Sequence, residues 1–224
     1  QTRELEHMVT QRTGELLASR AQIIRRLGRA AEFKDNETGN HVLRMSHYAR
    51  LIGQKLGIGE KAEEILFNTA PMHDIGKLGI PDSILRKPGK LTPDEWELMK
   101  RHSTIGAEII GKHDDDLLGT ARIIALTHHE KWDGSGYPQG LAGEDIPRVG
   151  RIVALADVLD ALLSERPYKP AYTIEESIAM IQEQSGKHFD PVMVEALISV
   201  LPEVAKIKET FADDLGALTD LEIK

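Results

Sequence analysis

Apolar side chains recur at intervals of three and four residues in one segment after another of this chain, and no stretch of any length alternates apolar with polar residues. Such spacing predicts amphipathic helices, because a half-buried strand would need a period of two. The clearest stripe lies in segment 41–56 and comprises Val42, Met45, Ala49, Ile52 and Leu56. Further helices are predicted at 61–80, 92–102, 117–130, 148–165, 173–186 and 190–202. The predicted fold class is therefore all-α.

Several of these segments carry residues that begin or end helices. Thr92 precedes Pro93 and stands three residues before Glu95, which is the arrangement of a capping box. Segment 173–186 also begins with a capping box and ends at a glycine. These signals support the helical prediction independently of the apolar spacing.

Composition excludes several classes of protein. The chain has no cysteine, so disulfides, thiolate nucleophiles and Cys-based zinc or iron–sulfur sites are excluded. A net charge of -8 argues against nonspecific binding of duplex nucleic acid, which needs a basic surface. No apolar stretch approaches the roughly 20 residues of a membrane span. We expect a cytoplasmic protein with no membrane span in this chain.

The N-terminal segment has a different character from the rest. It carries a heptad-like apolar stripe of Leu5, Val9, Leu16 and Ile23. This pattern predicts either a short parallel coiled coil, which would make the protein a homodimer, or a solvated helix packed on its own domain. The expected organisation is a linker or signalling helix at 1–27, a main domain at 28–202 and an acidic tail at 203–224. Because the chain begins in mid-helix at Gln1, we expect it to be a fragment.

Histidine and carboxylate residues gather in a local pattern that suits metal binding. Any one of them alone is more often a structural residue, but together they provide only nitrogen and oxygen ligands, which suit two or three octahedral divalent ions. In the predicted helices, His102 ends segment 92–102, and Asp157 lies in an apolar helix where an unpaired carboxylate is costly. The candidate ligands are Glu37, His41, His73, Asp74, His102, His128, His129 and Asp157.

These residues lie within longer motifs that resemble the HD-GYP family of metal-dependent phosphohydrolases. The motifs include "ETGNHVLR" at 37–44, "HDIGKLGIPDSILRKPGKLT" at 73–92, "HHEKWDGSGYPQGLAGEDIP" at 128–147 and "RIVALADVLDALLSERPYK" at 151–169. The resemblance extends over about residues 22–200. It implies an all-helical HD bundle with metals at its centre. It also implies hydrolysis of cyclic di-GMP to pGpG or GMP in bacterial signalling, as the output part of a response regulator.

The resemblance also implies how the ligands are divided. His41, His73, Asp74 and Asp157 would serve the first part of the site, with Asp74 bridging, and the second part would use His102, His128 and His129. Glu37 matches a ligand of members with three metals, so a dinuclear or trinuclear site is expected. Iron is the metal implied by the family, although manganese and other divalent ions suit the same ligands.

Substrate contacts are expected from cations and from a glycine-rich loop. Lys77 follows the His-Asp pair by one turn and is predicted to donate to a phosphate oxygen or to the attacking hydroxide, and the alternative is a surface lysine. Arg166 and Lys169 are predicted to clamp a phosphate or a guanine edge, and the alternative is a solvated basic loop. Gly136, Tyr137 and Pro138 would form a wall of the ligand cleft or a docking surface for a GGDEF-domain partner. A catalytically silent cyclic-dinucleotide sensor and a hydrolase of cyclic GMP-AMP are the alternative functions.

Overall fold

The computed structural model describes residues 2–35, 39–165 and 170–212. Within these ranges the chain is helical and contains no strand, so the all-α prediction is confirmed. The α-helices are α1 (Thr2–Lys34), α2 (Gly39–Lys55), α3 (Glu60–Thr69), α4 (Asp82–Leu85), α5 (Pro93–Lys100), α6 (His102–Ile110), α7 (Asp116–Thr127), α8 (Arg148–Leu163), α9 (Ile174–Glu183), α10 (Pro191–Ile198) and α11 (Leu201–Thr210). Short 3₁₀ helices are η1 (Ala70–Met72), η2 (Ile75–Gly79) and η3 (Gly143–Asp145).

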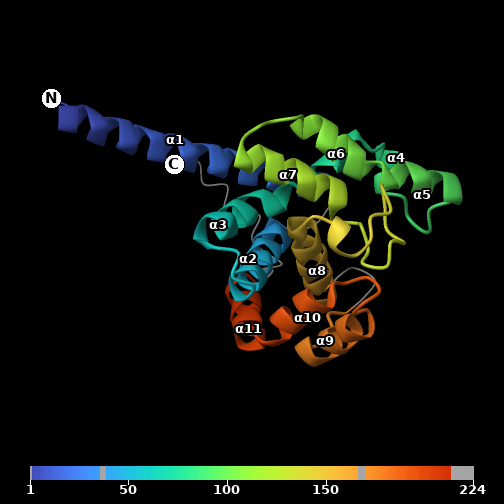
Figure 1. Ribbon diagram of the computed structural model, residues 1–224. Coiled ribbons are helices and arrows are strands. Elements are labelled where there is room, and N and C mark those ends of the chain that lie inside the picture. The colour runs from blue at the N-terminus through green and yellow to red at the C-terminus, as the bar shows by residue number, and fades with distance from the viewer. Residues whose placement is uncertain (1, 36–38, 166–169, 213–224) are drawn as a thin grey trace.

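Helix α1 projects away from the bundle and then enters it (Figure 1). Residues 2–19 are exposed, whereas Ala21, Ile24, Gly28, Ala31 and Glu32 are buried. The helix is continuous across the boundary predicted at residue 27, so one rigid element joins the exposed segment to the bundle.

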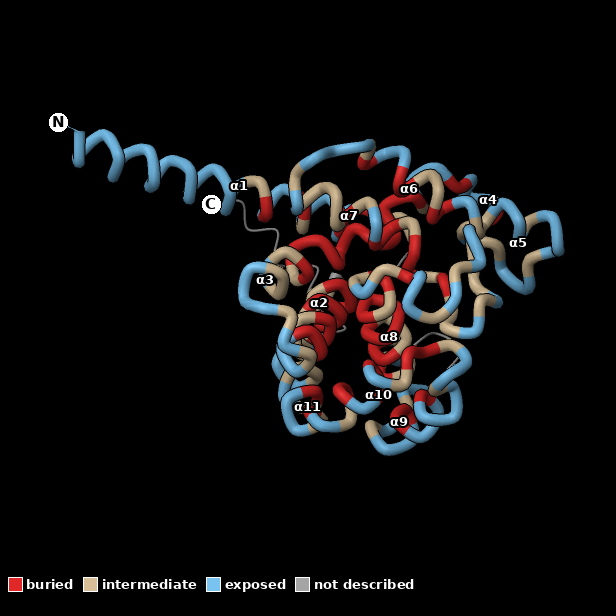
Figure 2. Tube along the Cα trace, in the orientation of Figure 1, coloured by how far each residue is buried: buried red, intermediate tan, exposed pale blue. Residues whose placement is uncertain are grey.

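The main core forms where α2 packs against α8, with α9, α10 and α11 closing one end (Figures 1 and 2). The predicted stripe of α2 supplies Met45, Ala49 and Ile52, each fully buried. On α8, buried residues occur all round the helix, as expected for an element covered on every side. In Figure 2 the buried residues follow these two helices, and a second buried cluster lies among α1, η1, η2, α6 and α7.

The single helix predicted at 61–80 is wrong. Helix α3 ends at Thr69, and the two 3₁₀ helices η1 and η2 follow, with His73 and Asp74 between them. Pro71 accounts for the break, because it has no backbone N–H to continue the α-helical hydrogen bonds. Gly76 is required just afterwards, since a Cβ at this position would lie 1.8 Å from the carbonyl oxygen of His102. This close approach sets α6 directly against the His-Asp pair.

The predicted helix 92–102 also needs correction. Helix α5 ends at Lys100, and His102 is the first residue of α6 rather than the last of α5. The last turn of α5 closes with a hydrogen bond from Arg101 N to Leu98 O at 3.1 Å, after which the chain bends into α6. The contact at Gly76 holds α6 in this separate direction.

The predicted helix starts agree with the structure. The side chains of Thr92 and Thr173 each accept a hydrogen bond in a complete capping box, and Asp190 caps α10. Helix α11 crosses the boundary predicted at residue 203 and buries Val204 fully, so the first part of the predicted tail is packed on the bundle. Among the described residues, no helix is long and apolar enough to cross a membrane.

Candidate metal centre

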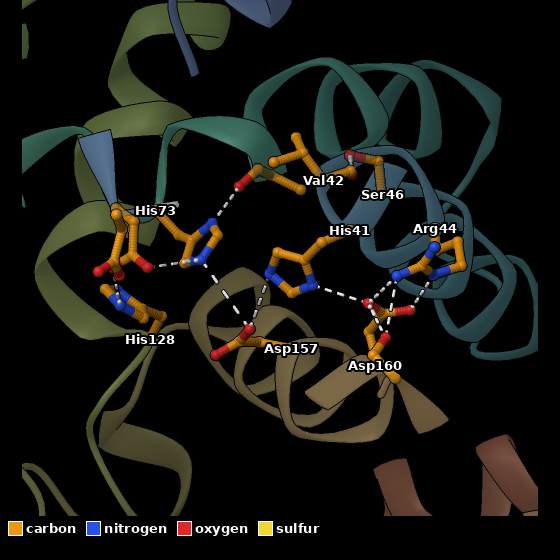
Figure 3. Close-up of polar contacts among 12 residues, drawn as sticks. His41, Val42, Arg44, Ser46, His73, His128, Asp157 and Asp160 are labelled. Carbon is orange, nitrogen blue, oxygen red and sulfur yellow. Dashed lines mark hydrogen bonds and ion pairs between the residues drawn. The ribbon is translucent and has the colours of Figure 1, made fainter. Parts of the chain in front are cut away.

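Five parts of the fold bring the predicted ligands together. His41 comes from α2, His73 and Asp74 from the η1–η2 junction, His102 from the start of α6, His128 and His129 from the end of α7, and Asp157 from α8. Figure 3 shows His41, His73, His128 and Asp157 pointing toward one another. Glu37 lies outside the described residues.

The first group of ligand atoms lies between α2 and α8. It comprises His41, His73 and Asp157, whose potential ligand atoms all lie within 4.8 Å of one another. His41 Nε2 is 3.4 Å from Asp157 Oδ1, and His73 Nε2 is 4.0 Å from the same oxygen. Two imidazole nitrogens thus face one carboxylate, as Figure 3 shows.

The second group surrounds Asp74. It comprises Asp74, His102, His128 and His129, again within 4.8 Å. His102 Nε2 and His128 Nε2 lie 3.2 and 3.4 Å from Asp74 Oδ1, whereas His73 Nε2 lies 3.2 Å from Asp74 Oδ2. The two oxygens of Asp74 therefore face different groups, which is the geometry expected of a bridging carboxylate.

Hydrogen bonds determine which nitrogen of each imidazole is available. Nδ1 of His73, His102 and His128 lies 2.7–3.1 Å from a backbone carbonyl oxygen one turn earlier. A carbonyl can only accept, so each Nδ1 carries a proton and each Nε2 is the ring nitrogen that faces the site. These Nε2 atoms and Asp74 Oδ1 are buried without a hydrogen-bond partner. Ring nitrogens and a carboxylate oxygen that converge in this way fit a divalent cation, and a hydrogen bond from the other ring nitrogen is how proteins orient metal-binding histidines.

His41 is oriented by a carboxylate instead of a carbonyl. Its Nδ1 donates to Asp160 Oδ2 at 2.7 Å, and Asp160 also accepts from Arg44 Nε at 2.7 Å and from Ser164 Oγ at 3.1 Å (Figure 3). Asp160 is fully buried. Sequence reasoning missed Asp160 and Arg44, although Asp160 stands three residues after Asp157 and so on the same side of α8.

The pKa values differ between the two ligand groups, being raised at His73 and lowered at His129. Burial by itself would lower the pKa of His73, but Asp74 and Asp157 outweigh burial and raise it to about 9. Burial would raise the pKa of Asp157, yet the hydrogen bond from His41 and the charge of His73 lower it. Burial followed by the neighbouring His128 and His102 lowers the pKa of His129 well below its usual range. The carboxylates are thus ionised, and a cation would be stabilised between them.

Lys77 lies beside the second ligand group. Its Nζ lies 2.8 Å from Asp74 Oδ2 and 2.5 Å from Asp35 Oδ2. The side chain is only 13% exposed, which excludes the alternative of a surface lysine. Asp35, which sequence reasoning missed, holds this ammonium beside Asp74.

The glycine-rich loop packs against the second ligand group. The Tyr137 ring stacks on His129 with centroids 4.7 Å apart, and the Tyr137–Pro138 peptide bond is cis. A Cβ at Gly136 would lie 2.4 Å from the backbone nitrogen of Lys131, so only glycine fits there. The carboxylate of Glu130 accepts from the backbone nitrogens of residues 139 and 141 and thereby closes the loop. The loop is therefore a wall of the site.

One buried carboxylate near the site was not predicted. Glu32 on α1 forms a third group with His73 and Asp74, within 4.8 Å. Burial, followed by the charge of Asp74, raises its pKa to about 7. Its burial within an otherwise polar helix was not visible in the sequence pattern. The predicted cations Arg166 and Lys169 lie outside the described residues.

Comparison with known proteins supports this picture. The HD domain family profile matches residues 13–193. A probable cyclic di-GMP phosphodiesterase of Vibrio cholerae is 43% identical over 98% of this chain and 53% of its own length. A cyclic di-GMP phosphodiesterase response regulator of Xanthomonas campestris is 45% identical over 93% and 55%. A 3'3'-cGAMP-specific phosphodiesterase of V. cholerae is 42% identical over 89% and 38%.

The fold also has a counterpart among solved structures. The crystal structure of a cyclic GMP-AMP-specific phosphodiesterase of V. cholerae aligns with a TM-score of 0.66 at 22% identity, over 86% of this chain and 51% of that one. The chain spans about half the length, or less, of the curated relatives it matches. The profile covers most of the sequence and includes every described candidate ligand. The chain therefore belongs to the HD domain family.

Proposed function

We propose that this chain is a metal-dependent phosphodiesterase that hydrolyses cyclic di-GMP to pGpG or GMP. The observation that carries the proposal is the convergence of Nε2 atoms from His73, His102 and His128 on the two oxygens of Asp74. Relatives at 43% and 45% identity are named as phosphodiesterases of this dinucleotide, which supports the choice of substrate.

The described ligand groups would hold at least two divalent ions. His41, His73 and Asp157 would bind one, the group of His102, His128 and His129 another, and Asp74 would bridge them. Such ions supply Lewis-acid stabilisation of phosphate oxygens and a lowered pKa for water. Iron is the proposed metal, with manganese as an alternative, and Glu37 is the proposed further ligand of a third ion.

The chain's own residues position the substrate and donate to it. Lys77, held by Asp35 and Asp74, would donate a hydrogen bond to a phosphate oxygen. Asp160 accepts from Nδ1 of His41 and so turns Nε2 toward Asp157 and the candidate metal site. The ring of Tyr137 beside His129 offers a flat apolar surface to a base. Arg166 and Lys169 remain the predicted phosphate clamp.

The test is an anaerobic assay with a single preparation. The full chain is loaded with Fe²⁺ or Mn²⁺, the metal content is counted, cyclic di-GMP is added, and products are separated by chromatography. We expect pGpG or GMP, abolished by a chelator and by Asp74→Ala. Binding of cyclic di-GMP without product by the metal-loaded protein would refute the enzyme and favour the sensor alternative.

Hydrolysis of cyclic GMP-AMP is the second candidate activity. The 42% identical relative named for this substrate is the observation that favours it. Competition of the two dinucleotides in the same assay, compared as kcat/KM, decides between them. A larger kcat/KM for cyclic GMP-AMP would overturn the proposed preference.

The exposed face of α1 supports a homodimer. Leu5, Val9, Leu16 and Ile23 are 55–62% exposed on the projecting segment, where a second copy can cover them. Sedimentation of the full chain should give a dimer, and Leu16→Glu should give a monomer. Docking of a GGDEF-domain partner on the 136–138 loop remains a prediction.

A further inference from the structure

Glu32 is a fully buried carboxyl group with no partner in the described part of the chain. Its relative exposure is 0%, and neither Oε1 nor Oε2 has a hydrogen-bond partner. It lies in the docked half of α1 and faces His73 and Asp74, with which its oxygens form a group within 4.8 Å. Its side chain is thus directed into the metal centre from an element that carries none of the predicted ligands.

Such an arrangement needs a compensating partner. A buried polar group left without a hydrogen bond destabilises the folded protein, and it does so more strongly if it is charged. Protonation alone does not satisfy both oxygens, because the unprotonated oxygen of the carboxyl would still lack a donor. A cation satisfies both oxygens at once, and carboxylate oxygens are suitable ligands for divalent ions alongside imidazole.

We infer that Glu32 is a ligand of the divalent ion held at His73 and Asp74. This inference rests on the metal site of the proposed function, but it is independent of the substrate. It adds a carboxylate from α1 to the ligands from the η1–η2 junction. It also places one ligand on the same continuous helix as the exposed segment 2–19.

The contacts around Glu32 fix its helix against the η1–η2 segment. Lys34 Nζ donates to the carbonyl oxygens of residues 77, 78 and 80 at 2.7–3.1 Å. A Cβ at Gly28 would lie 2.4 Å from the carbonyl oxygen of Pro71, so the two backbones are in direct contact. Close packing on both sides of Glu32 holds its carboxylate at the site, as a metal ligand requires.

The test counts ions in the absence of substrate. Wild type, Glu32→Gln and Glu32→Met are stripped with a chelator, titrated with Mn²⁺ as the only metal, and analysed for metal per chain and for dissociation constants. We expect both variants to bind about one ion fewer per chain, or to bind the weakest ion at least about tenfold less tightly. Glu32→Met should also raise the melting temperature of the chelated protein, because it removes an unpaired buried carboxyl.

A matched control separates ligand loss from general destabilisation. Asp190 is also a buried carboxylate, but it pairs with Arg151 at 2.6 Å and caps α10 outside the candidate metal groups. Asp190→Asn should lower stability while keeping the wild-type ion count and affinity. Wild-type ion count and Mn²⁺ affinity in Glu32→Gln would overturn the inference. That result would not refute the proposed phosphodiesterase activity, which is tested by hydrolysis of cyclic di-GMP. Conversely, a protein that does not hydrolyse cyclic di-GMP could still show the expected loss of an ion in the Glu32 variants.

Discussion

Replacing Asp160 with asparagine should destabilise the bundle and loosen the metal centre together. Asp160 is fully buried and accepts hydrogen bonds from His41 Nδ1 and Arg44 Nε, each at 2.7 Å. Asparagine keeps the shape but removes the negative charge that faces the guanidinium of Arg44, which is 3% exposed. Removing one partner from a buried ion pair costs about 3–5 kcal/mol. Neither group is exposed enough for solvent to reduce this value.

Urea unfolding of the metal-free protein measures the effect directly. With a slope of about 2 kcal/mol per molar urea, the midpoint should fall by about 1.5–2.5 M. Affinity for Mn²⁺ should fall about 10–100-fold, because His41 loses the group that fixes its tautomer. The double variant Arg44→Met with Asp160→Leu should recover part of the stability, because it removes the buried guanidinium charge of Arg44. It should not recover the metal affinity, because His41 Nδ1 still lacks the carboxylate of Asp160. A midpoint within about 0.5 M of wild type would refute the assigned role of the ion pair.

Three further predictions follow from individual contacts. Gly76→Ala should lower the free energy of unfolding by at least about 1–3 kcal/mol and should lower the metal content by displacing His102. Gly14→Ala, with open space around it, should be neutral or stabilising. Equal effects of the two substitutions in urea unfolding would contradict this reasoning. Burial lowers the pKa of His188 from 6.5 to about 4, so the unfolded chain binds the proton first as the pH decreases. Stability should therefore fall as the pH decreases from about 6.5 toward 4. In His188→Gln the melting temperature should fall less over this pH range. Thr173→Ala should lower the free energy of unfolding by about 1 kcal/mol through loss of its capping box, and an unchanged value would show that the cap is not needed.

The helical class and the first residues of the helices were predictable because they depend on interactions between residues close in the sequence. The spacing of Val42, Met45 and Ile52 defines one buried face whatever the partner, and Thr92 caps its helix through residues three positions away. The interruption at Pro71 was missed, although proline was visible in the sequence. Its apolar surroundings were interpreted as a continuous helix.

The identity of most site residues was also predictable, but their arrangement was not. The motifs around His73, His128 and Asp157 indicated a metal site by residue type and order. The family resemblance implied that Asp74 bridges the two parts of the site, but the sequence contains no distances, so it could not show which imidazole groups each oxygen of Asp74 faces. Nor could it distinguish Lys77 at the site from a surface lysine.

The amino-acid sequence by itself determined the all-helical class, the helix starts and the choice of nitrogen and oxygen ligands, because propensity, capping and ligand chemistry are properties of residues and their near neighbours. Only the tertiary structure decided the roles of Glu32 and Asp160. Each is an ordinary acidic residue in a helix until packing removes it from water, and a buried carboxylate must then find a partner on another element. For Asp160 that partner is the Arg44–His41 pair, and for Glu32 we infer that it is the metal.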